Sequence, residues 1–280
     1  MQVPKLDFIE LKYYENVWPD DELEVFDSVL GLAIEHVTEE REGGETPPRL
    51  PGTFRQMINE GLLDENVVSI RWPRTKDEIG DITFGGYDEK LFKGELVKHP
   101  LWPKNTTEWR VGIDALYLLK QDGSEATKIT GSGPSTRSSS NKPDWNALLM
   151  NTTPMIGFPQ IMAEIFFRSI PAKRSECPGA PPVVDCNIVP SLPELIIEMN
   201  GQNITLNGED YVKEYTPPEW LCHDAKSECM VTVADLPPWD DTFPPDMIVL
   251  GTAFLANVYG VFNWDERSVF CELPSFGVPV

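Results

Sequence analysis

The sequence is poor in basic residues and lacks long apolar runs. Its 280 residues include 23 Lys and Arg against 45 Asp and Glu, which gives a formal net charge of −22 at pH 7. Nucleic acids and anionic membrane surfaces are bound through clustered cations. A membrane-spanning helix needs a run of about 18 or more apolar residues, and none occurs. We therefore expect no nucleic-acid partner and no membrane span.

Metal-binding patterns are also missing. No Cys-x-x-Cys pair occurs, and the three histidines, His36, His99 and His223, are scattered along the chain. Zinc sites usually combine closely spaced Cys or His pairs, so we expect no metal site and no cofactor. The cysteines instead favour one or two disulfides. Cys271 lies in the apolar run Val269–Cys271 and is predicted to be a buried free thiol.

The beginning of the sequence, MQVPKLDFIE, has neither a basic segment nor an apolar segment of the kind that directs secretion. Three Asn-x-Thr tripeptides, at Asn105, Asn151 and Asn203, nevertheless match the acceptor pattern of secreted glycoproteins. These signals conflict. Either the protein is cytosolic or its true N-terminus is missing.

Short apolar segments separated by Gly, Pro, Asn and Asp predict a mainly all-β protein with short helices. The 26 prolines also limit the length of regular elements. The clearest strand candidates are Val67–Ile70, Asp81–Phe84, Trp109–Ile113 and Leu195–Met199, with a further strand at Leu6–Leu11. Gly131–Pro143 is predicted to be a flexible polar loop, and Glu176–Cys186 an irregular connection.

Two segments have the apolar spacing of a core-packing helix. The first contains Phe54, Met57, Ile58 and Leu62, and the second contains Met162, Ile165, Phe166 and Ile170. Thr53 is placed to cap the first helix. Pro159 suits the first turn of the second.

An apolar pair followed by glycine occurs twice, as Val29-Leu30-Gly31-Leu32-Ala33 and as Val249-Leu250-Gly251-Thr252-Ala253. The first copy lies in FDSVLGLA and is followed by GDITFGGYDEKLFKGELVKHPL. The second lies in MIVLGTAFLANVYGVFNWDERSVF. In this order the segments resemble the pepsin-like aspartic proteases, family A1, whose typical wording is close to FDGILGLG, G-x-x-x-x-GG-x-D, ILGD-x-F-L and Y-x-V-F-D. The chain is identified as a member of that family over nearly its whole length.

The resemblance implies a bilobal acid-protease fold with a substrate cleft between two β-rich lobes. It assigns residues 1–100 to a partial N-terminal lobe and residues 101–280 to a complete C-terminal lobe. In the family, each lobe supplies one Asp from a D-[ST]-G loop. The two carboxylates share a proton, so that one acts as base towards a water and the other as acid.

The stretch LLMNTTPMIGFP occupies the place of the second Asp loop, with a degenerate loop at residues 151–155. Asn151 stands at the Asp position, Thr152 at the Thr position and Thr153 at the Gly position, and no D-[ST]-G occurs anywhere in the sequence. An amide cannot hold the shared proton. We expect no catalytic residue, and Asn151, Thr152 and Thr153 are the candidates for lining the cleft. A β-branched residue at the Gly position predicts a strained or remodelled loop.

The resemblance also implies a disulfide between Cys186 and Cys229 in the C-terminal lobe. Bridges Cys177–Cys222 and Cys222–Cys229 both stay open on spacing. A glycan is hard to fit at Asn151 in a closed cleft, so glycosylation is expected at Asn105 and Asn203 instead. The family suggests a secreted or vacuolar protein, although this chain carries no leader.

Three hypotheses for the function follow. The first is an aspartic protease-like protein that has lost peptidase activity, with a residual cleft for a peptide, protein or other ligand and with completion by another chain as an option. The second is an aspartic endopeptidase with an incomplete N-terminus, which leaves Asn151 unexplained. The third is a pepsin-like fold reused for non-proteolytic binding or chemistry, for which Asp114, Asp144 and Asp185 are the candidate acids.

Overall fold

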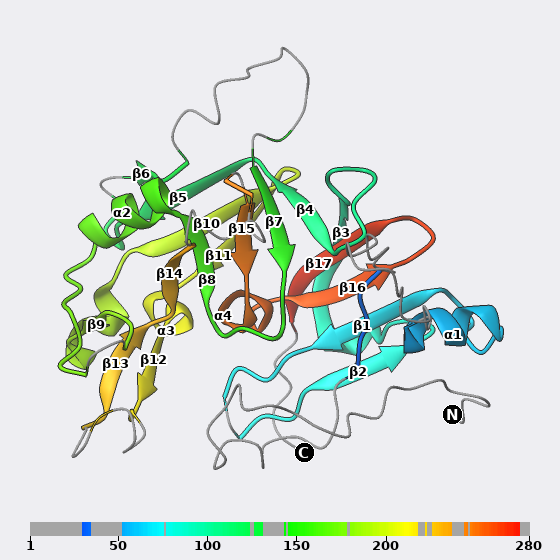
Figure 1. The fold of residues 1–280 in the computed structure, drawn as a ribbon, viewed down its shortest axis with the longest axis horizontal. Helices are drawn as coiled ribbons and strands as arrows, with labels where there is room; N and C mark the ends of the chain where they lie inside the picture. Colours follow the sequence, from blue (N-terminus) through cyan, green and yellow to red (C-terminus); the bar gives the residue numbers. More distant parts are fainter. Residues whose placement is uncertain are drawn as a thin grey trace, which may run out of the picture.

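The protein is built mainly of short strands. The computed structural model describes residues 30–34, 52–75, 77–123, 126–130, 143, 145–177, 180–217, 222, 226–236, 244–245 and 247–274. Strands dominate this part of the chain and its helices are brief, which confirms the predicted fold class. One sheet with helix α1 lies to one side of Figure 1, and three further sheets lie to the other.

The first sheet has five antiparallel strands in the order β2-β1-β16-β17-β3. Its strands are β1 (Val67–Arg71), β2 (Asp81–Phe84), β3 (Phe92–Pro100), β16 (Tyr259–Asn263) and β17 (Ser268–Pro274). Strands β1 to β3 come from residues before 101, and β16 and β17 from the end of the described chain. The sheet therefore connects the two segments that the sequence assigned to different lobes.

The second sheet has the order β14-β8-β15-β7-β4 and carries the loop at residues 151–155. Its strands are β4 (Arg110–Ile113), β7 (Trp145–Leu149), β8 (Ile156–Pro159), β14 (Val233–Leu236) and β15 (Met247–Leu250). Strand β15 runs parallel to β7 and antiparallel to β8. All four of its residues are buried, as expected for a central strand covered on both faces.

Two smaller sheets complete the architecture. One has the order β11-β10-β5-β6, from β5 (Ala115–Leu119), β6 (Ala126–Lys128), β10 (Glu194–Met199) and β11 (Gln202–Leu206). The other has the order β12-β13-β9, from β9 (Val183–Val184), β12 (Val212–Tyr215) and β13 (Glu228–Val231). Strand β9 corrects the prediction that Glu176–Cys186 is wholly irregular, because Val184 pairs with Cys229 there.

Helix α1 (Thr53–Asn59) is shorter than its apolar spacing predicted. Gly52 occupies the N-cap position, so Thr53 lies inside the helix and the predicted Thr53 cap was wrong. Gly61 has a φ of 63° just after the helix. This left-handed geometry, which favours glycine, turns the chain away. Leu62 still packs against the core, but from outside the helix.

Helix α2 (Gln160–Arg168) follows β8 directly, with Pro159 as its N-cap residue. Its buried face contains Phe166, whose ring contacts Tyr211 edge to face at 5.5 Å between centroids. Ile170 lies beyond the helix end and is buried there. The other short helices of the described residues are α3 (Gly208–Tyr211), α4 (Thr252–Leu255), η2 (Glu89–Leu91) and η3 (Cys186–Ser191).

One hydrophobic cluster runs from α1 through both five-stranded sheets to α2. Phe54, Trp109, Phe158 and Phe254 all belong to it. The predicted strand at Leu6–Leu11 and residues 131–142 of the predicted polar loop lie outside the described residues.

Candidate functional site

The loop between β7 and β8 carries the three predicted cleft residues. Strand β15 lies between these two strands, so the loop has to pass around the end of β15. Figure 1 shows it at the same end of the sheet as α4. Asn151 and Thr152 are exposed there, and Thr153 is half-buried. The sheet order thus places this loop against the second apolar-apolar-glycine copy.

Backbone hydrogen bonds tie the loop to the start of α4. The N–H of Gly251 donates to the carbonyl of Met155 at 3.0 Å, and the N–H of Thr252 donates to the carbonyl of Thr153 at 2.8 Å. Within the loop, the Met155 N–H donates to Oγ1 of Thr153 at 3.3 Å. Thr153 and Met155 of the loop are therefore held by neighbours on a different segment of the chain.

From the sequence, Thr153 is predicted to stand where the family pattern has glycine. Among the described non-glycine residues, positive φ values occur at Asn200 and Arg267, so Thr153 does not adopt the left-handed region. Its hydroxyl also satisfies a backbone donor of the loop. The loop holds this β-branched residue without left-handed backbone strain.

Gly251, the glycine of the second copy, is required because the backbone of the 151–155 loop approaches it closely. A Cβ atom on Gly251 would lie 2.2 Å from the carbonyl oxygen of Met155 and 2.4 Å from that of Thr153. Both distances are far below van der Waals contact, and the neighbours are backbone atoms rather than flexible side chains. A glycine after the apolar pair is what allows the loop to rest on α4.

A pocket of about 240 Å³ opens at this loop. Its lining includes residues 30–33 of the first apolar-apolar-glycine copy together with Asn151 and Thr152. The other lining residues are Val68, Ile70, Trp72, Trp109, Leu149, Met150, Leu255 and Phe262. Segments far apart in the sequence therefore meet at a single depression.

Aromatic side chains form one wall of this cleft pocket. The ring of Phe262 lies edge to face with Trp109 at 5.2 Å and with Trp72 at 6.1 Å between centroids. Trp109 Nε1–H donates to the carbonyl oxygen of Leu32 at 2.9 Å. This hydrogen bond attaches the first copy to the segment that leads into β4. It therefore links two parts of the pocket wall that are far apart in the sequence.

The described lining of the cleft pocket is electrically neutral. None of its described lining residues is Asp, Glu, His, Lys or Arg, and Asn151 and Thr152 provide an amide and a hydroxyl. An amide does not titrate in the range that acid–base chemistry needs. These groups can donate and accept hydrogen bonds to a ligand, but they do not form a proton-sharing pair.

The other candidate acids lie elsewhere. Asp114 borders a different pocket, and Asp185 caps η3 by accepting a hydrogen bond from the Asn187 N–H at 2.9 Å. Asp144 is outside the described residues. Within the described part of the chain, no group of three or more His, Cys, Asp or Glu side chains could hold a metal ion. Among those same residues, no helix is both long and apolar enough to cross a membrane.

Two disulfides stabilise the segment after α2. Cys186 is bonded to Cys229, the pair that the family resemblance implied, and Cys177 is bonded to Cys222, one of the two pairings that spacing left open. The bridge Cys222–Cys229 is therefore excluded. Cys271 is free and buried, as predicted.

The aromatic wall was not found from the sequence. Trp72 follows β1, Trp109 precedes β4 and Phe262 lies in β16, and no local spacing indicates that the three meet. The only signal available was the family pattern around residues 26–33 and 247–270, which marks the strands beside the cleft but not their aromatic neighbours.

Comparisons with known proteins agree with this architecture. A family model described as eukaryotic aspartyl protease matches residues 3–271. The chain is 27% identical to probable vacuolar protease A of Trichophyton verrucosum over 247 residues, covering 87% of this chain and 51% of the relative. It is 28% identical to a vacuolar aspartic protease of Candida albicans over 248 residues, covering 87% and 49%.

Similarity extends to an animal protein. Renin-2 of Mus musculus is 26% identical over 245 residues, covering 85% of this chain and 51% of the relative. The chain spans about half the length of the curated relatives it matches. Because the family model covers nearly the whole sequence, this chain belongs to the eukaryotic aspartyl protease family.

Proposed function

We propose that this chain is a pepsin-like protein without peptidase activity of its own, whose cleft binds an uncharged, apolar peptide segment. The observation that carries the proposal is that the described lining of the cleft pocket is neutral and includes Asn151. The family resemblance assigns Asn151 to the position of a catalytic Asp. The proposal has two parts, the loss of acid–base chemistry and the retention of a binding surface.

The loss of chemistry follows from the groups at the loop. Aspartic proteolysis needs two carboxylates that share one proton, because one activates water while the other protonates the scissile amide. Asn151 and Thr152 supply neither role. In the family, repulsion between two neighbouring carboxylates raises the pKa of one of them, so that the pair keeps one proton. A neutral amide produces no such repulsion.

The retained surface suits an apolar side chain of an extended peptide. Trp72, Trp109 and Phe262 provide a rigid aromatic wall, and the pocket volume of about 240 Å³ is below the roughly 300–1,000 Å³ of typical small-molecule pockets. Asn151 and Thr152 stand at its edge, where their polar atoms can bond a peptide backbone. A charged side chain in this pocket would lose its hydration without gaining a partner.

The principal alternative is an endopeptidase with further sequence beyond this chain. The coverage of about half of each relative supports it. The amide at Asn151 counts against it, because that position lies within the present chain. Reuse of the fold for other chemistry has less support at this pocket, since Asp114 and Asp185 do not line it.

Two features near β2 support the addition of a strand from another chain to the first sheet. Among the described strands, β2 is at the edge of its sheet, and Ile79, Ile82 and Tyr87 near it are exposed, Ile79 by 82%. An open edge with apolar side chains favours pairing with a further strand. We include a second polypeptide at β2 in the proposal as a partner separate from the cleft ligand.

A secreted or vacuolar location is part of the proposal. The similar fungal proteins are named as vacuolar proteases, and two disulfides suit an oxidising compartment. Asn105 and Asn203 are exposed, which supports glycan attachment there. Mass spectrometry of the chain from a secreting host should show glycans at these two positions, and unmodified peptides at both would contradict this part.

The binding proposal is tested with a short peptide of apolar residues, capped at both ends, by isothermal titration calorimetry. Thr152→Arg places a long charged side chain at the pocket and should weaken binding at least tenfold. Thr205→Arg, the same change at an exposed position of β11, should leave the affinity as in the parent when all proteins are made without glycans, since Thr205 belongs to the Asn203 acceptor tripeptide. Equal affinities for the parent and both variants would contradict binding in the cleft.

A further inference from the structure

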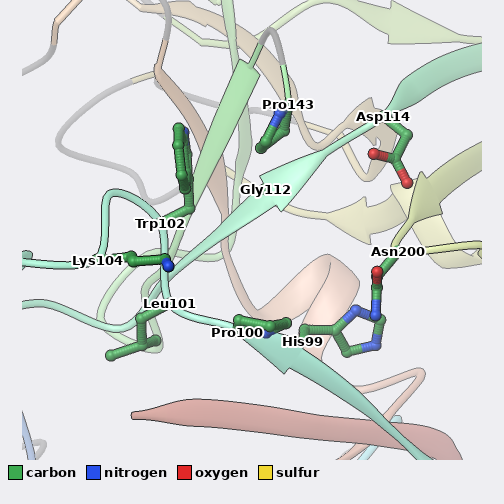
Figure 2. A pocket seen from close by; sticks show the side chains of 9 residues that line it. All are labelled: His99, Pro100, Leu101, Trp102, Lys104, Gly112, Asp114, Pro143 and Asn200. Atoms are coloured by element: carbon green, nitrogen blue, oxygen red, sulfur yellow. The ribbon is translucent and has the colours of Figure 1, made fainter. Parts of the chain in front are cut away.

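A second pocket, of about 430 Å³, lies where β3 leads into β4. It shares no lining residue with the cleft pocket. Figure 2 shows His99, Asp114 and Asn200 gathered at one end, with Trp102 and Lys104 at the other. The pocket therefore has a carboxylate at one end and an ammonium group at the other.

The end with the carboxylate is built by the tip of the β10–β11 hairpin. Asn200 and Gly201 have φ values of 45° and 78°, which fits the two-residue Asn-Gly turn that favours this geometry. Asn200 Nδ2 donates to the carbonyl of Lys98 at 2.8 Å, and the Gly201 N–H points to Asp114 Oδ2 at 3.4 Å. The turn thus fixes the tip against β3 and next to Asp114.

His99 contributes a buried nitrogen with no partner. Its side chain is 1% exposed, and its Nε2 lies 2.9 Å from Oε1 of Gln202. Gln202 Nε2 donates to the carbonyl of Cys271 at 3.3 Å, so the oxygen of the amide faces the ring and His99 Nε2 carries the hydrogen. Nδ1 then presents a lone pair, and it has no hydrogen-bond partner among the described residues. Such atoms are rare in folded proteins.

The surroundings keep the His99 ring neutral. Burial lowers its pKa, while the hydrogen bond to Gln202 and the negative charge of Asp114 act in the opposite direction without reversing the shift. A neutral ring leaves Nδ1 available as an acceptor at neutral pH. In Figure 2 the ring lies at the edge of the pocket, on the side of Asn200. Nδ1 itself has less than 1 Å² of accessible surface, so a donor on a molecule in the pocket satisfies it with a small displacement of the ring or its neighbours.

The two charges at the ends of the pocket are not paired with each other or with other described side chains. The walls between them include the apolar Pro100 and Pro143. Pro143 approaches closely because Gly112 has no side chain: a Cβ there would lie 2.4 Å from Pro143 Cγ. The pocket thus has an anionic end, an apolar middle and a cationic end.

We propose that this second pocket binds a small zwitterion with an apolar body. The ammonium group of the ligand donates to the Asp114 carboxylate and to His99 Nδ1, and its anionic group pairs with Lys104. An ammonium ion has several donors and can serve both acceptors at once. A neutral alcohol can donate a hydrogen bond to Nδ1, but its interaction with the Asp114 carboxylate is weaker because it carries no charge. A ligand with a cationic group at both ends is repelled by Lys104. The proposal is independent of the binding proposed for the cleft.

A series of linear ω-amino carboxylic acids with increasing numbers of methylene groups tests this proposal. These probes contain no peptide bond, so the cleft does not recognise them as peptides. Binding is followed through the ring signals of histidine by NMR, since the chain has three histidines and His36→Gln and His223→Gln identify the signal of His99. We expect a saturable shift of the His99 signal and an affinity that is highest at one chain length, which reports the span between Asp114 and Lys104.

Matched probes and variants separate the two ends. The alkylamine and the fatty acid of the optimal length should each bind roughly tenfold or more weakly than the zwitterion, because each loses one charge-assisted contact. Asp114→Asn should weaken the binding of the alkylamine. Lys104→Met should weaken the binding of the fatty acid. Asp64→Asn and Lys90→Met, at exposed positions outside the pocket, should change neither affinity.

Three results would overturn the proposal. The first is the absence of any saturable change in the His99 signal with every member of the series. The second is equal binding of the zwitterion and the alkylamine, which would remove Lys104 from the site. The third is an unchanged affinity of Asp114→Asn for the alkylamine, which would show that the Asp114 carboxylate does not bind the ligand.

Discussion

Replacing Gly251 by alanine tests how the loop that carries Asn151 is held. The added Cβ would lie 2.2 Å and 2.4 Å from the carbonyl oxygens of Met155 and Thr153. Relieving such overlap in a packed site costs about 1–3 kcal/mol. Moving the segments apart also lengthens two hydrogen bonds, from Gly251 at 3.0 Å and from Thr252 at 2.8 Å, each with a net contribution of about 1 kcal/mol. The expected loss in the free energy of unfolding is roughly 3–5 kcal/mol.

The assay is unfolding in guanidinium together with thermal melting, both under oxidising conditions. For a chain of this size, the expected loss lowers Tm by roughly 6–10 °C. Gly86→Ala is the matched control, because a Cβ at Gly86 meets no atom within 4 Å and its φ is not positive. It should be as stable as the parent or slightly more stable. If Gly251→Ala were no less stable than Gly86→Ala, the reasoning about the close approach would be refuted.

Three further predictions concern the cysteines and His99. Replacing Cys186 and Cys229 by serine opens a bridge with a sequence separation of 43 and should cost about 4 kcal/mol in guanidinium unfolding; a change below about 1 kcal/mol would contradict the chain-entropy estimate. Burial lowers the pKa of His99 below its ordinary value of 6.5, so the unfolded chain binds a proton first and stability falls as the pH drops below 6.5 towards the folded pKa. His99→Asn should show a flatter dependence there, and parallel curves would contradict the prediction. Burial, with a smaller effect of the Glu272 charge, raises the pKa of Cys271 to about 12, so the native thiol should resist iodoacetamide at about pH 8; rapid labelling of the native chain, seen by mass spectrometry, would exclude this.

Strand positions could be predicted from the sequence because they depend on short, local patterns. The prediction at Asp81–Phe84 coincides with β2, and that at Leu195–Met199 differs from β10 by one residue. Helix ends were less accessible. Apolar spacing extended the predicted first helix to Leu62, but the helix ends earlier, before the left-handed turn at Gly61. The spacing of apolar residues carries no information about such a change in backbone direction.

The prediction for the loop at residues 151–155 depends on the family order of the segments around it, which the family model matches over residues 3–271. The assignment of Asn151 to the Asp position stays a prediction from that order. The neutrality of its surroundings was not visible in the sequence, because Trp72 and Phe262 reach the pocket from strands or turns remote in sequence. The second pocket was equally hidden, since His99 and Asn200 are brought together by the docking of one hairpin tip on another sheet. Tertiary packing, not local pattern, creates both pockets.

The most direct test of the central claim is an acid proteolysis assay on the purified chain. A quenched fluorescent peptide is incubated at acidic pH with the parent and with Asn151→Asp, each with and without pepstatin. The sequence has no D-[ST]-G loop, and one restored carboxylate cannot form a proton-sharing pair. We therefore predict no pepstatin-sensitive cleavage by either protein. Pepstatin-sensitive cleavage by the parent would contradict the account, and cleavage gained by Asn151→Asp alone would mean that a second carboxylate already stands at the cleft.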